Sequence, residues 1–342
     1  MIITRRFPLR TVIIWGSRVA ILAGLWAAVV FGVFAVTGWR FIAVPFLPIA
    51  TIGTAVAFYI GFKNNSAYDR FWEGRKIWGG IVNASRTWAT AAIVYSDPGE
   101  DDERARATRR TLLYRQLAWI NALRLQLRRT SRFHDKPSPT TRRRLDRDAA
   151  HMRNDWDTEL APFLTPAELA EVSAKANPAT QLLARQASEL RDLALSGRLD
   201  MFRQIELMGV IRELFELQGR CERIKNTPFP RPYAEFSRIF TRVFVFLLPF
   251  GLLDVFADHV REATTTFESV SPVIPMILAS TLVSWVFATM EGIGDSSEDP
   301  FERSMNDVPM NALCRTIEID VREMLGETSL PPKEAPAGIV LY

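Results

Sequence analysis

The sequence predicts an all-α membrane protein with four transmembrane helices and a large helical region outside the membrane. Its 342 residues are 48% hydrophobic, and the apolar residues gather in a few long segments instead of being spread evenly. The segments 41–62 and 269–290 each run for 22 residues without a charged side chain. A helix of that length covers about 33 Å, which is enough to cross a hydrocarbon core of ~30 Å.

Four spans are expected, at about 19–39, 41–62, 236–256 and 269–290. The first and third spans are less uniformly apolar than the other two. The first is apolar over residues 21–36 and extends toward Arg18 and Trp39, and the third carries Arg242 near its start and Asp254 near its end. A buried core helix is therefore an alternative interpretation of these two segments. The spans nevertheless form two hairpins with short connectors, which favours four membrane crossings.

Basic residues near the ends of the spans predict the orientation. One side of the membrane carries Arg5, Arg6, Arg10, Arg18, Lys63, Arg70, Arg75, Lys76, Arg231, Arg238 and Arg242. The other side carries only Arg40 and Arg261. Since lysine and arginine are enriched in cytoplasmic loops, both chain termini and the long middle segment are expected to be cytoplasmic.

The region outside the membrane, residues 63–232 and 291–325, has a helical pattern almost throughout. Residues 104–153 are dense in arginine, with leucines at helical spacing between them. A nucleic-acid surface is less probable for this pattern than an amphipathic helix beside an anionic membrane. Further on, Thr165 is placed to cap a helix that begins with Pro166. The proline-containing segment 326–342 is expected to be a mobile tail, or to lie over a neighbour.

The stretch "YIGFKNNSAYDRFWEGRKIWGGIVNASRTWA" (59–89) passes from apolar to charged residues without a proline. It is expected to continue the second span as one helix that leaves the membrane. Two stripes mark the membrane part of this helix. Thr54, Phe58 and Phe62 recur every four residues, and Gly53, Ala57 and Gly61 form a stripe of small residues beside them. Small residues allow neighbouring helices to approach closely.

Enzyme motifs are missing from the sequence. It contains no glycine-rich phosphate loop, no nucleophile elbow and no cluster at metal-ligand spacing. A membrane enzyme is therefore disfavoured, and neither a cofactor nor a metal is expected. The two cysteines, Cys221 and Cys314, both fall on the predicted cytoplasmic side, where thiols stay reduced.

Two long segments resemble the signature blocks of the bestrophin family, in its bacterial branch. They are "AYDRFWEGRKIWGGIVNASR" (67–86) and "EDPFERSMNDVPMNALCRTIEID" (298–320). The signature residues in them are Arg70, Trp72, Glu73, Arg75, Trp78, Asp299, Pro300, Phe301, Asn306 and Asp307. The resemblance covers residues 1–325 as one channel domain. It implies a homopentameric ion channel of the bacterial inner membrane in which the second spans line a central pore.

The resemblance also implies roles for individual residues. Thr54, Phe58 and Phe62 match the hydrophobic neck of the family, although Thr54 stands where a bulky apolar residue is usual. The alternative for this stripe is packing against lipid or against another subunit. Ile205 matches the cytoplasmic aperture, but Met201 and Phe202 lie within one turn, and a buried core isoleucine is the alternative.

A calcium site is expected to be weak or absent. Relatives from animals bind calcium through an acidic run, whereas the corresponding stretch here is "ERSMND", which leaves Asp307 as the weak candidate ligand. An alternative for this region is a helix that starts at Pro300 with Asp299 as its cap.

Selectivity stays open at the level of sequence. Aromatic rings have positive edges and negative faces, so a phenylalanine neck is compatible with chloride and other small anions, or with monovalent cations. A candidate from another functional class is a membrane-anchored helical scaffold or signalling protein.

Overall fold

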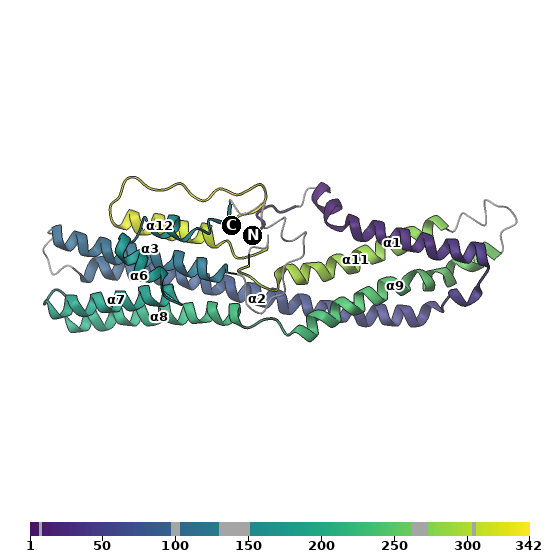
Figure 1. Cartoon of the computed structure of the whole chain (residues 1–342), viewed down its shortest axis with the longest axis horizontal. Coiled ribbons are helices and arrows are strands. Elements are labelled where there is room, and N and C mark those ends of the chain that lie inside the picture. The colour runs from purple at the N-terminus through teal and green to yellow at the C-terminus, as the bar shows by residue number, and fades with distance from the viewer. Residues whose placement is uncertain (7–8, 97–102, 130–150, 262–272, 303–305) are drawn as a thin grey trace. The chain divides into compact units, whose positions relative to one another are not determined.

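The computed structural model describes residues 1–6, 9–96, 103–129, 151–261, 273–302 and 306–342. Within these ranges the regular structure is helical, apart from isolated β-bridges that pair residue 340 with residues 2 and 337. The elements are α1 (Leu9–Thr37), η1 (Arg40–Ile42), α2 (Phe46–Tyr95), α3 (Glu103–Leu127), α5 (Trp156–Leu160), α6 (Pro166–Ser173), α7 (Pro178–Leu195), α8 (Met201–Asn226), α9 (Arg231–Arg261), α11 (Val273–Ser297) and α12 (Met310–Met324). Figure 1 shows their order along the chain.

The described chain divides into two compact units. Unit 1 comprises residues 1–3, 70–228 and 299–342, and unit 2 comprises residues 4–69 and 229–298. Helix α2 belongs to both units, because its 50 residues run from Phe46 to Tyr95 without a break. The prediction that residues 59–89 continue the second span as one helix is confirmed.

Unit 2 is a bundle of α1, the first part of α2, α9 and α11. Helix α1 packs against α11 and α9, and α9 packs against α11. Two glycines permit close helix contacts, since a Cβ atom on Gly53 would lie 2.7 Å from the Phe244 ring and one on Gly251 would lie 2.8 Å from Ile49. The buried core consists of Val30, Phe31, Phe34, Ile49, Val56, Ile60, Phe244, Leu248, Leu252, Leu253 and Met276.

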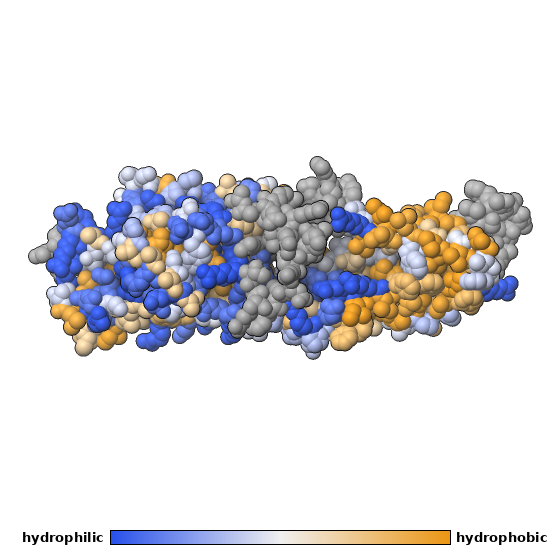
Figure 2. Space-filling model, viewed as in Figure 1, coloured by the Kyte–Doolittle hydropathy of each residue, from blue (hydrophilic) through white to orange (hydrophobic). Residues whose placement is uncertain are grey.

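The four helices of this bundle are long and apolar enough to cross a membrane. The segments are Gly16–Thr37, Arg40–Tyr95, Arg231–Phe256 and Val273–Ser297, among the residues that the structure describes. In Figure 2 the surface over these helices is mostly hydrophobic, whereas the surface over unit 1 is mostly hydrophilic. The four predicted spans are therefore confirmed in number and order, although residues 269–272 lie outside the described ranges. The chain is an α-helical membrane protein.

Unit 1 forms around helix α3. Nearly every residue of α3 from Leu112 to Leu127 is buried, and the second part of α2 contributes Trp78, Ile81 and Trp88 to the same core. Helix α3 packs against α7, α8 and α12. In Figure 1 the helices α7 and α8 lie side by side along this unit.

Two of the arginines in α3 have a different role from the predicted one. Arg115 is buried and pairs with Glu168 at 2.8 Å, and Arg124 is buried beside Glu159. Apolar periodicity alone did not identify them, because arginine is usually a surface residue and enters a core only with partners.

Helix caps in unit 1 agree with the sequence. Thr165 and Glu168 form a capping box at the start of α6, and Pro166 is the first helical residue. Asp200 accepts hydrogen bonds from the backbone N–H groups of Phe202 and Arg203, which fixes the start of α8. The prediction of Thr165 as a cap is confirmed.

The segment 326–342 packs on unit 1. Leu341 donates its backbone N–H to Met1 O at 2.8 Å, and Ala312 donates its backbone N–H to Tyr342 O at 2.9 Å. Glu334 pairs with Arg153 at 3.1 Å. The domain boundary at residue 325 stays a prediction.

The packing of α3 leads to a stability prediction. Leu117 is fully buried in unit 1, and Leu117→Ala should destabilise the protein by ~2–5 kcal/mol because it leaves a cavity in a close-packed core. The matched control is Leu195→Ala, since Leu195 is 80% exposed at the end of α7, and its effect should stay within about 0.5 kcal/mol. Thermal unfolding of the purified protein measures both, and equal shifts in Tm would contradict this description of the core.

Candidate functional site

The predicted neck residues lie on the outer face of α2. Phe58 is 81% exposed and Phe62 is 50% exposed, and Thr54 is exposed as well. Residues Val56 and Ile60, on another face of the same helix, are buried in the core of unit 2. In this chain Thr54 and Phe58 therefore face away from the core of unit 2, and Phe62 is half-exposed, so the stripe is available to face a lumen, a lipid or another subunit.

The stripe of small residues does not act as one surface. Gly53 is buried against Phe244 of α9, so its missing side chain serves packing inside unit 2. Ala57 is exposed, and a Cβ atom on Gly61 would meet no described atom within 4 Å. Of the two glycines in this stripe, Gly53 therefore has a close contact with another described helix and Gly61 does not.

Aromatic side chains of α9 contact Phe62, the last residue of the stripe. The Phe62 and Tyr233 ring centroids are 5.6 Å apart. Tyr59 stacks on Tyr233 at 6.2 Å and meets Phe240 edge-on at 5.8 Å. Aromatic pairs at these separations are mutually stabilising, so the orientation of Phe62 depends on the start of α9.

The predicted aperture residue lies in the first turns of α8. Ile205 is 59% exposed, so it is not the buried core isoleucine that the sequence left as an alternative. Phe202, one turn earlier, is 79% exposed, and Met201 is exposed too. The structure places an apolar group of three residues here and does not single out Ile205 within it.

The two signature segments meet inside unit 1. The Arg70 guanidinium lies 3.5 Å from the Asp299 carboxylate and donates to Ile224 O at 3.2 Å. A Cβ atom on Gly74 would lie 3.1 Å from the Phe301 ring, which itself is buried. The two blocks thus pack on each other although more than two hundred residues separate them in the sequence.

The other signature residues differ in burial. Trp78 is fully buried, Trp72 is half-exposed, and Glu73 pairs with Lys76 at 3.4 Å. A Cβ atom on Gly79 would lie 3.6 Å from an Arg75 guanidinium nitrogen. These residues shape the second part of α2, and Trp78 belongs to its core face.

No helix starts at Pro300. Pro300 and Phe301 lie in a turn, and the next described helix begins at Met310. The alternative of a helix that starts at Pro300 with Asp299 as its cap is therefore wrong, since the Asp299 carboxylate lies near Arg70.

The metal prediction is only partly covered by the structure. Asn306 is partly exposed and Asp307 is buried, whereas Ser304 and Met305 lie outside the described residues. Within the described ranges no group of three or more His, Cys, Asp or Glu side chains could hold a metal ion. The weak or absent calcium site stays a prediction.

A buried ion-pair network in unit 2 was not foreseen. Lys63 was assigned to the basic flank of the second span, yet its side chain is 1% exposed. Its ammonium donates to Glu291 at 2.7 Å and also to Asp295. Asp295 in turn accepts from Arg238 at 3.3 Å. The prediction of Lys63 as a flanking charge is therefore corrected, because Glu291 and Asp295, which are far away in the sequence, pair with its ammonium.

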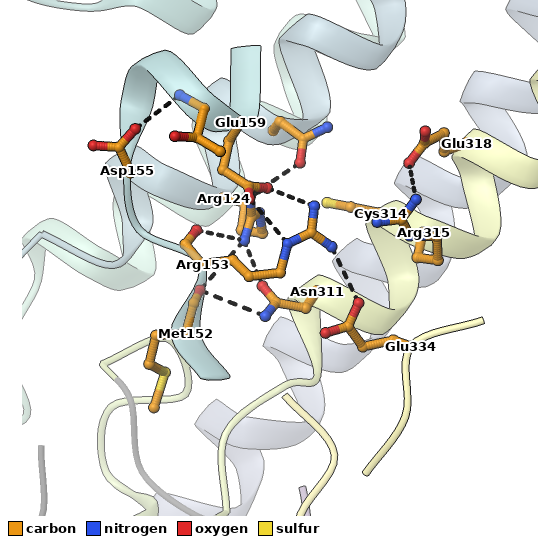
Figure 3. A network of polar contacts seen from close by, with 12 residues as sticks. Arg124, Met152, Arg153, Asp155, Glu159, Asn311, Cys314, Arg315, Glu318 and Glu334 are labelled. Carbon is orange, nitrogen blue, oxygen red and sulfur yellow. Dashed lines mark hydrogen bonds and ion pairs between the residues drawn. The ribbon is translucent and has the colours of Figure 1, made fainter. Parts of the chain in front are cut away.

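A second buried network joins three parts of unit 1 (Figure 3). Arg124 of α3 donates to Glu159 of α5 and to Asn311 of α12, and it also donates to Arg153 O at 3.0 Å. Arg153 has a positive φ of 50° and makes two hydrogen bonds to Glu159, at 2.8 and 2.9 Å. A charged group buried among several partners is a structural anchor, so this network fixes the segment 151–160 against α12.

These features define the class as a polytopic α-helical membrane protein with a helical domain outside the membrane. The family model described as bacterial/fungal bestrophin protein matches residues 11–323. The chain therefore belongs to the bacterial and fungal bestrophin family.

Similar proteins include a "Voltage-dependent anion channel-forming protein" of Mesorhizobium japonicum, 30% identical over 94% of this chain and 84% of the relative. A protein of the same description from Escherichia coli K12 is 28% identical, over 84% of this chain and 80% of the relative. The crystal structure of a bacterial bestrophin homologue from Klebsiella pneumoniae shares the fold, with a TM-score of 0.71 at 24% identity, over 91% of this chain and 98% of that one.

The two cysteines lead to a reactivity prediction. Both are buried free thiols, and burial raises the pKa of the Cys314 thiol to about 11 and raises the pKa of Cys221 as well. Because the thiolate is the reactive form, a raised pKa keeps both thiols protonated at pH 8. We expect the native protein to resist a thiol-reactive dye at pH 8 and the denatured protein to react at both positions. Rapid labelling of the native protein, lost in Cys221→Ser or Cys314→Ser, would contradict this.

Proposed function

We propose that the protein is a bestrophin-type ion channel whose α2 helices surround a central pore. The observation that carries the proposal is the exposed stripe of Thr54, Phe58 and Phe62 on a helix whose Val56 and Ile60 are buried in the core of unit 2. A ring of such helices would turn the stripe toward a common axis. A narrow apolar collar gates ions because water leaves it readily.

In this proposal Phe58 and Phe62 form the neck, and Thr54 is a wetter ring above them. Ile205 is proposed as the second constriction, and its exposure in the first turns of α8 supports that role. Gly53 has no side chain, so the Phe244 ring of α9 packs closely against the buried face of α2 at this level.

We propose chloride or other small anions as the permeant ions. The relatives whose names describe an activity are called anion channel-forming proteins, and these names support anions over cations. Phenylalanine rings also offer positive edges to an anion in a narrow neck. A monovalent-cation channel is the alternative outcome of the flux experiment below.

The proposed assembly is a homopentamer, as the family resemblance implies. One chain alone leaves Thr54 and Phe58 exposed and Phe62 half-exposed, so it cannot enclose a pore. The proposed location is the bacterial inner membrane with both termini in the cytoplasm, which the distribution of lysine and arginine supports. No enzymatic role is proposed.

Flux from liposomes tests the function directly. Purified protein reconstituted under opposing chloride and sodium gradients should dissipate the chloride gradient faster than the sodium gradient. The same flux is expected with a calcium chelator present. The mass of the complex in mild detergent should equal five chains. A stable monomer without flux would contradict the channel and favour the scaffold, and faster sodium flux would favour the cation channel.

The neck residues lead to a second prediction. Replacing Phe58 and Phe62 together by alanine should raise the chloride flux, because it widens the collar and removes the surface that repels water. The matched control is Phe41→Ala, since Phe41 is also exposed but lies in η1, outside α2. Flux and complex size are measured on the same preparation.

Two results would overturn the role of the neck. An intact ring with unchanged flux would show that the phenylalanines do not constrict the pore. Loss of the ring in Phe58→Ala/Phe62→Ala, with Phe41→Ala intact, would show that they pack between subunits, as large-to-small changes in a core cost ~3–5 kcal/mol.

A further inference from the structure

Lys63 lies directly after the proposed neck residue Phe62, and its ion pairs connect α2 to α11. The ammonium of Lys63 on α2 bonds to Glu291 and Asp295 on α11, and Asp295 also bonds to Arg238 on α9. An ionisable residue buried among membrane helices is expensive and usually functional. We call Lys63, Glu291 and Asp295 the latch.

Helix α11 approaches α2 closely at the latch. A Cβ atom on Gly294 would lie 2.3 Å from Asn64 Oδ1 and 3.4 Å from Lys63 Cε, so no larger residue fits without a shift. Asn64 also donates its side-chain N–H to Met290 O at 3.0 Å. The contact is therefore both ionic and steric, and it lies at one level of α2.

This contact fixes the rotation of α2. Successive residues of a helix point about 100° apart, whereas residues four apart share a face. With Lys63 held toward α11, Phe62 is directed away from α11, and Phe58 shares its face. The Phe62 ring then meets Tyr233 of α9 at 5.6 Å. Release of Lys63 would allow the whole neck stripe to turn.

The charges favour positioning over a direct electrostatic role in selectivity. The network holds two cations, Lys63 and Arg238, and three carboxylates, those of Glu291, Asp295 and Glu235, so the fields of these charges partly cancel at a distance. Arg238 has a further partner in Glu235 at 3.0 Å. Arg238 consequently stays paired when the latch is neutralised, which makes the latch separable by mutation.

We propose that Lys63 is a positioning residue that, through the latch, sets the direction of Phe58 and Phe62 and keeps the neck narrow. The flux arm of its test rests on the proposed channel function, whereas the labelling arm does not.

The test neutralises the latch without leaving an unpaired charge, in Lys63→Met/Glu291→Gln/Asp295→Asn. Chloride flux should rise by about threefold or more, as expected for coupled residues, and Lys63→Arg should keep the wild-type flux. In a Phe58→Ala/Phe62→Ala background the same triple change should add little, because the latch acts through these two rings. Asp295→Asn alone, which keeps the pair of Lys63 and Glu291, should give a smaller rise.

A labelling measurement reports the neck without using flux. A Phe58→Cys reporter should react faster with a water-soluble thiol reagent when the latch is neutralised, by about threefold or more. The background is low because Cys221 and Cys314 are buried. The matched control is Arg86→Met/Asp320→Asn, which removes an exposed ion pair of 2.7 Å on the distal part of α2 and should change neither flux nor labelling.

The labelling and flux results distinguish a failure of the latch from a failure of the proposed channel function. Faster labelling in a protein without any flux supports the latch and overturns the channel. Unchanged labelling in a protein with flux overturns the latch and keeps the channel. An equal rise in flux with and without the two phenylalanines also overturns it, and so does a triple variant that fails to assemble while Asp295→Asn behaves as wild type.

Discussion

Backbone hydrogen bonding in the membrane is the constraint on which the structure of helix α2 depends. A chain that crosses hydrocarbon must satisfy every N–H and C=O group within itself, which only a helix does in a segment of this length. The first part of helix α2 meets this demand. The helix then continues to Tyr95, and the tryptophan and isoleucine side chains of its second part are buried in the core of unit 1. One unbroken helix therefore serves two environments.

Because helix α2 is continuous, its rotation about its own axis decides which of its side chains are buried and which are exposed. In unit 2, Val56 and Ile60 are buried while Phe58 and Phe62 are exposed, so a rotation of the helix would exchange core and outer residues. In unit 1, Trp78 and Trp88 occupy the buried face. The burial of Val56 and Ile60 and the close contact of Gly53 with Phe244 favour one rotation in unit 2, and the ion pairs of Lys63 and the close contact at Gly294 favour the same one.

Buried charges have a similar role in both units. Lys63 in unit 2 and Arg124 in unit 1 are each almost fully buried. Lys63 bonds to two carboxylates of α11, and Arg124 bonds to residues on α5 and α12. Such groups add little net stability relative to apolar residues, but they penalise every arrangement that leaves them unpaired. Their geometry is specific, whereas the surrounding leucines tolerate rearrangement.

The sequence by itself determined the all-α class, the four spans, the continuation of α2 and the Thr165 cap, because run length, periodicity and capping depend on neighbouring residues. That Thr54, Phe58 and Phe62 share one face of the helix also follows from their spacing, whereas their exposure comes from the structure. Tertiary structure alone decided that Lys63 and Arg124 are buried, that Gly53 packs inside its own unit, and that Pro300 lies in a turn. The physical reason is distance along the chain: Glu291 lies 228 residues from Lys63, and Asn311 lies 187 residues from Arg124. No local pattern reveals such a partner, and without its partner each of these cations resembles any other surface charge.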